Sequence, residues 1–247
     1  MKNLIKYEFR KTWSTKLIIL AITAFAELAF LISLYTDQEN YTVISIVILT
    51  FLAFGGVLFI GIQSIVTMHQ DMNTKQGYML YMTPNSCYKI LGGKVVENGL
   101  SMFVAGAFFF ALGVLDVTLL FSHYGQLNDL VEMIKELMRQ MRIETSLDAS
   151  LFFALTFSFL CGWLCTVITA YLADVVATCL LNGKKHNGWI SLLLFILLTW
   201  AVTSLQQACT GHLVWNVRFY LNAAIAIACA AVMYLATAFL MDRHLSV

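Results

Sequence analysis

The chain has 247 residues, of which 60% are hydrophobic and 12% are charged, and its formal net charge is +1. A soluble domain is about 45–50% apolar and about 25% charged, so this balance excludes an ordinary soluble protein. The small net charge offers no basic field for nucleic acid. We therefore expect an all-α integral membrane protein, with a single transmembrane domain and the lipid bilayer as its surroundings.

The first element predicted along the chain is an interfacial helix over residues 1–16. Ile5, Phe9 and Trp13 recur at intervals of four and form an apolar stripe. The charged residues on the other side are Glu8, Arg10 and Lys11. Such a stripe is typical of a helix lying in the membrane surface, and a disordered basic tail is the alternative.

Six apolar runs follow, and each is close to or above the ~20 residues that a helix needs to cross a bilayer. The predicted spans cover residues 17–35, 43–67, 96–121, 151–181, 189–209 and 219–241. Lysine and arginine concentrate on one side of these spans, with only Lys135, Arg139, Arg142 and Arg218 on the other. The positive-inside rule then predicts a multi-pass protein of the cell membrane with both termini in the cytoplasm.

A polar segment over residues 69–94 separates the second and third spans. It contains the single proline of the chain, Pro84, which disfavours a helical conformation at Thr83. Ser86 can cap a new helix that continues into the third span. The segment should therefore hold a short helix, a break at Pro84 and a second helix start.

Residues 77–94 read GYMLYMTPNSCYKILGGK and resemble the first cytoplasmic loop of type-2 permeases of ATP-binding-cassette (ABC) transporters. The shared pattern is a glycine, an apolar helix, a proline, a small hydroxyl residue, an Ile-Leu pair and Gly-Lys. Tyr78 and Tyr81 depart from it, because many members have a threonine and an acidic residue there. The resemblance implies that 69–94 is a cytoplasmic coupling loop and that 1–16 is an elbow helix. The residues implied in contact with an ATPase subunit are Gly77, Tyr78, Leu80, Tyr81, Pro84, Tyr88 and Lys89.

The resemblance also implies partners and a task. Permeases of this family pair with a second copy or a related permease, bind an ABC ATPase subunit, and mostly export substrates. The run Gly92-Gly93-Lys94-Val95 lacks the spacing and the hydroxyl residue of a phosphate-binding loop. The chain is therefore expected not to be an enzyme and to bind no cofactor, with ATP and magnesium held by the partner subunit. The substrate class stays open among peptides, lipids and drug-like molecules.

Polar side chains within the spans are candidates for a translocation path: Glu27, Gln63 and Asp174. A charge near the bilayer centre costs about 2.5–3.5 kcal/mol on insertion scales, so these groups should face protein or a watery cavity. A structural hydrogen bond between helices is the alternative for each of them. Glu97 and Asp116 lie nearer the ends of the third span, where water is close.

The outer segment 123–148 is predicted to contain an amphipathic extracellular helix. Its apolar face would consist of Leu127, Leu130, Val131, Ile134, Leu137, Met138 and Met141. This helix could act as a lid or dimer contact, or as a substrate gate. It also supports a different class of function, a non-transporting immunity or signalling module that binds an extracellular ligand.

The sequence predicts no catalytic residues and no metal site. The five histidines fall in predicted loops or at helix ends, with no H-E-x-x-H pair and no G-x-S-x-G turn. Cys161 and Cys165 share a helix face, but no histidine or acid nearby would complete a set of metal ligands.

Overall fold

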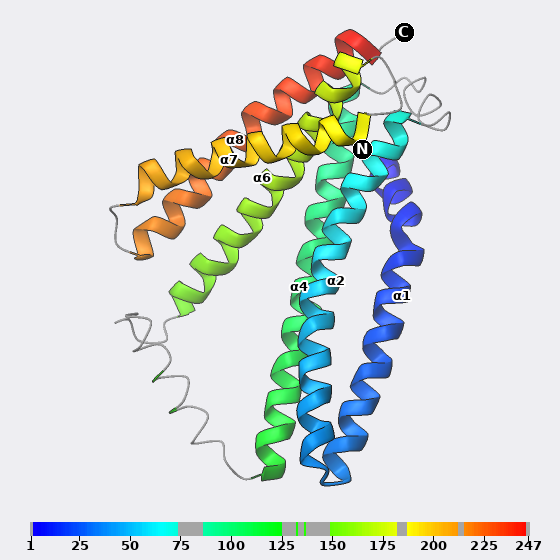
Figure 1. Cartoon of the computed structure of the whole chain (residues 1–247), viewed down its shortest axis with the longest axis vertical. Coiled ribbons are helices and arrows are strands. Elements are labelled where there is room, and N and C mark those ends of the chain that lie inside the picture. Colours follow the sequence, from blue (N-terminus) through cyan, green and yellow to red (C-terminus); the bar gives the residue numbers. More distant parts are fainter. Residues whose placement is uncertain are drawn as a thin grey trace. The chain divides into compact units, whose positions relative to one another are not determined.

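A computed structural model describes residues 2–73, 86–124, 132, 136, 149–181, 187–211 and 215–245. The helices of this part are α1 (Lys2–Tyr35), α2 (Glu39–Asn73), α4 (Cys87–Tyr124), α6 (Ala149–Leu181), α7 (Asn187–Thr210) and α8 (Trp215–Leu245) (Figure 1). No strand occurs among these described residues. All six helices are long and apolar enough to cross a membrane, and each contains one predicted span. The predicted all-α membrane architecture is confirmed at this level.

The first helix corrects the prediction of a separate interfacial element. Residues 2–35 form one continuous helix of 34 residues, since neither glycine nor proline interrupts the backbone ladder between the charged start and the apolar run. The burial of Glu8 also departs from the expectation of a helix lying in the membrane surface. Trp13 is 56% exposed, whereas Glu8 is only 2% exposed. The side of this first stretch that carries Glu8 and Thr12 therefore faces protein, whereas Arg10 is exposed.

Two predicted segments lie largely outside the described residues. The first is the predicted coupling loop, of which residues 74–85 are not described. The second is the predicted extracellular helix, whose apolar face is not described. The helix start predicted after Ser86 is confirmed. The Ser86 carbonyl accepts hydrogen bonds from the amides of Lys89 and Ile90 at 2.9 and 3.2 Å, and α4 begins at Cys87.

The described residues divide into two compact units. Unit 1 draws on residues 1–12, 60–101 and 149–247, and unit 2 on residues 13–59 and 102–148. In unit 1, α6 packs on α8 and on α7. One core cluster of unit 1 has Met68, Leu91, Tyr171 and Met241 at its centre, so side chains of α2, α4, α6 and α8 are buried together.

Unit 2 contains the tight turn that joins α1 to α2. Asp37 has φ 55°, a left-handed conformation that an aspartate adopts more readily than most residues. The hydroxyls of Ser33 and Thr42 lie 2.9 Å apart across this turn. Phe30, Leu34 and Leu49 form the buried cluster beneath it. This turn falls in the interval between the first two predicted spans, residues 17–35 and 43–67.

In unit 1, α2 approaches α6 closely at one glycine. A Cβ atom added to Gly61 would overlap the indole ring of Trp163. Overpacking of this kind costs about 1–3 kcal/mol, because the ring and its neighbours must shift to make room for the added methyl group. We expect Gly61→Ala to lower the thermal unfolding midpoint of the purified protein in detergent.

Gly55→Ala is the matched control for this prediction. It lies on the same helix, and a Cβ atom there would meet nothing within 4 Å. Its midpoint should equal or exceed that of the wild type, since alanine favours helix more than glycine. Equal midpoints for the two variants would contradict the close α2–α6 contact.

Candidate functional site

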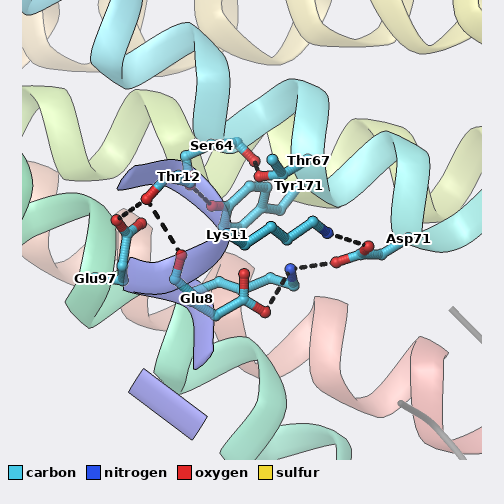
Figure 2. Close-up of polar contacts among 9 residues, drawn as sticks. Glu8, Lys11, Thr12, Ser64, Thr67, Asp71, Glu97 and Tyr171 are labelled. Atoms are coloured by element: carbon cyan, nitrogen blue, oxygen red, sulfur yellow. Dashed lines mark hydrogen bonds and ion pairs between the residues drawn. The ribbon is translucent and has the colours of Figure 1, made fainter. Parts of the chain in front are cut away.

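Four charged side chains meet inside unit 1, and we call them the ion cluster: Glu8, Lys11, Asp71 and Lys94. The Lys94 ammonium lies 2.9 Å from Glu8 Oε1 and 2.5 Å from Asp71 Oδ2. Lys11 Nζ lies 2.5 Å from Asp71 Oδ1 (Figure 2). Asp71 is therefore shared by two lysines, and the cluster joins the first turns of α1 to the last turn of α2 and the start of α4.

The ion cluster is balanced in charge, and three of its four members are buried, while Lys11 is half-buried. The Lys94 side chain is 2% exposed, and those of Glu8 and Asp71 are also buried. A buried charge is tolerated only when a partner replaces the water that it has lost. Two ammonium groups and two carboxylates satisfy that condition together. Each member of the cluster consequently depends on the presence of the others.

Hydroxyl groups extend the ion cluster along α4. Thr12 and Ser101 lie 3.0 and 2.9 Å from Glu97 Oε1, and both can donate a hydrogen bond to it. Figure 2 shows Thr12 and Glu97 facing each other beside Glu8. In the same view the hydroxyls of Ser64 and Tyr171 meet at 2.5 Å. Polar contacts therefore join α1, α2, α4 and α6 within one unit.

The candidate translocation residues have structural contacts. Asp174 is 3% exposed and its Oδ1 lies 2.6 Å from His69 Nδ1, so α6 and α2 are linked there. Gln63 lies on α2 in the same unit and is half-buried. Glu27 belongs to unit 2, where Asp116 is its neighbour.

Of the predicted ATPase-contact residues, Tyr88 and Lys89 are described, and both are exposed on the first turn of α4. The Tyr234 hydroxyl donates a hydrogen bond of 2.6 Å to the carbonyl of Tyr88, which ties this turn to α8. The residues outside the described part are Gly77, Tyr78, Leu80, Tyr81 and Pro84.

Sequence reasoning missed the ion cluster, although the signal was present. Glu8, Lys11 and Thr12 lie on one side of α1, at spacings of three and four. Lys94, Glu97 and Ser101 form a similar polar stripe on α4. Two polar stripes next to apolar spans indicate helices that pack against each other through polar groups.

No protein-family model matches the chain, and neither does any curated protein or solved structure. Within the described helices, no three histidine, cysteine, aspartate or glutamate side chains gather as a metal site would require. Function must therefore be inferred from the residues and contacts of this chain.

Breaking the ion cluster from one side should destabilise the protein. Lys94→Met removes the central ammonium and leaves Glu8 buried without its counter-charge. Breaking a buried ion pair from one side costs about 3–5 kcal/mol, so the thermal unfolding midpoint should fall markedly. Lys89→Met, on the exposed side of α4, is the control and should leave the midpoint unchanged.

The direction in which a second substitution shifts the thermal unfolding midpoint tests the same contact. Glu8→Gln should lower the midpoint in the wild-type background, where Glu8 partners Lys94. In the Lys94→Met background it should raise the midpoint, because it removes the unmatched carboxylate. The same sign in both backgrounds would be inconsistent with pairing between Glu8 and Lys94.

Proposed function

We propose that this chain is the permease subunit of a type-2 ABC exporter, driven by a separate ATPase subunit. The observation that carries the proposal is the position of the resembling segment. α2 ends at Asn73 and α4 begins at Cys87, and both helices are long and apolar enough to cross a membrane. The resembling residues 77–94 thus begin between two candidate spans and continue into the start of α4.

This arrangement supports a mechanical task. A force applied to residues 74–85 acts directly on the ends of two helices of 35 and 38 residues. Each helix contributes residues to both compact units. A partner that pulls or turns the segment would therefore reach most of the described chain, as an alternating-access cycle requires.

The distribution of charge supports a cytoplasmic partner. Lys75, Lys89 and Lys94 fall on the side of the membrane that also holds the basic N-terminal residues. By the positive-inside rule this is the cytoplasmic side, where ATP is found. The ATPase subunit would bind ATP and magnesium, and this chain would pair with a second permease. Peptides, lipids and drug-like molecules all remain compatible as substrates.

Exposed aromatic side chains support docking by a protein. Tyr88 is 37% exposed on the first turn of α4, next to the exposed Lys89. Tyrosine contributes large contact area at low entropic cost, which makes it common at protein interfaces. Tyr78 and Tyr81 would extend this aromatic surface into the segment.

The proposal is tested by co-purification from the native cells with a tag on this chain. An ATPase subunit should be retained, and Tyr81→Glu should reduce its retention about tenfold or more, since a charge at an aromatic anchor disrupts a docking surface. Membrane insertion should be unchanged. Transport by the variant should fall in parallel.

Tyr41→Glu provides the matched control, because Tyr41 is an exposed tyrosine at the opposite end of α2. It should retain the ATPase subunit at the wild-type level. If no ATPase subunit is retained by the wild type, or if both tyrosine variants retain it equally, the docking role is wrong.

A further inference from the structure

We propose that the N-terminal segment, residues 2–12, is a positioning element for the stem of the 74–85 segment. The stem consists of the end of α2 and the start of α4. Its link to partner docking rests on the proposed function. The structural part of the proposal rests only on contacts within unit 1.

The ion cluster bridges the two sides of the stem. Asp71 precedes the 74–85 segment and Lys94 follows it, and their side chains pair at 2.5 Å. This contact restrains the separation of the two helix ends that the segment joins. A segment with a restrained stem presents its docking residues in fewer orientations, which lowers the entropic cost of binding a partner.

One face of the N-terminal segment packs along α4 at three successive turns. Leu4, Glu8 and Thr12 are spaced by four residues and therefore lie on the same side of α1. The Glu8 carboxylate contacts Lys94 and the Thr12 hydroxyl contacts Glu97. The Leu4 side chain lies over Gly93, so close that an added Cβ atom would come within 2.5 Å of it.

Lys11 completes the arrangement on the other side of the stem. Its ammonium contacts Asp71 Oδ1, while Lys94 contacts Oδ2 of the same carboxylate. The N-terminal segment thus touches α2 through Lys11 and α4 through Leu4, Glu8 and Thr12. Because the N-terminal segment contacts both the end of α2 and the start of α4, it restrains these two helix ends relative to each other.

The contact between Leu4 and Gly93 permits a test by size complementation. Gly93→Ala adds one methyl group beneath Leu4 and should displace the Leu4 side chain, which weakens the packing of the N-terminal segment on α4. The substitution favours helix within α4 itself, so a loosened N-terminal segment could not be attributed to unfolding of that helix. Leu4→Ala in the same chain restores the space and should restore the contact.

Amide hydrogen exchange of the full chain in nanodiscs provides the first readout. In Gly93→Ala, amides of residues 2–12 should exchange several-fold faster than in the wild type, as expected for a weakened packing contact. The Leu4→Ala/Gly93→Ala double variant should exchange at close to the wild-type rate. Gly106→Ala, where a Cβ atom meets nothing within 4 Å, is the control on the same helix.

Retention of the ATPase subunit is the second readout. Gly93→Ala should lower it several-fold, and the double variant should recover it. Equal exchange in Gly93→Ala and Gly106→Ala would overturn the role of the Leu4–Gly93 contact in holding the N-terminal segment on the stem. Faster exchange with undiminished retention would overturn the positioning role. Absence of a co-purifying ATPase in the wild type would instead overturn the proposed function, and the exchange data would still decide whether the N-terminal segment packs on the stem.

Discussion

The Lys94 ammonium is the constraint on which unit 1 depends. With 2% of its side chain exposed, it has lost nearly all contact with solvent and takes two carboxylates in place of water. Those carboxylates come from α1 and α2, so the charge can be buried only when three helices meet. A second lysine then balances the shared aspartate. The need to neutralise the buried Lys94 charge, more than the burial of apolar surface, determines where the first turns of α1 lie.

Polar contacts of this kind suit a protein whose helices are apolar over most of their length. In lipid, apolar side chains gain little by leaving the bilayer for a helix interface, so they specify helix pairs weakly. Hydroxyls, carboxylates and ammonium groups specify them much better, because an unpaired one is costly. Ser64 with Tyr171, and His69 with Asp174, give α2 and α6 a definite register in the same way.

The architecture was predictable from the sequence because it depends on local composition. Each apolar run corresponds to one helix, and the turn near Asp37 and the helix start after Ser86 follow from short polar signals. The helix ends were not predictable from hydropathy. Hydropathy marks only the apolar part of a helix and does not detect the polar helical turns that extend it. This explains why residues 2–16 form part of α1 and do not form a separate element.

The ion cluster could not be derived in the same way. Its members are far apart in the sequence, and only the tertiary structure shows that Glu8 pairs with Lys94. The apolar stripe of Ile5, Phe9 and Trp13 favoured a membrane-surface helix, and it was a sound amphipathic pattern. The error was to assign water to the opposite face. In a membrane protein the polar face of a helix can equally turn toward other polar helices.

The pairing of Glu8 with Lys94 also constrains biosynthesis. When α1 and α2 have been translated, the nascent chain contains Glu8, Lys11 and Asp71. Lys94, which neutralises Glu8, has not yet been translated. Until α4 emerges, the early turns of the nascent chain carry one carboxylate too many for a buried site. Burial of these turns is therefore costly until Lys94, near the start of α4, has been translated.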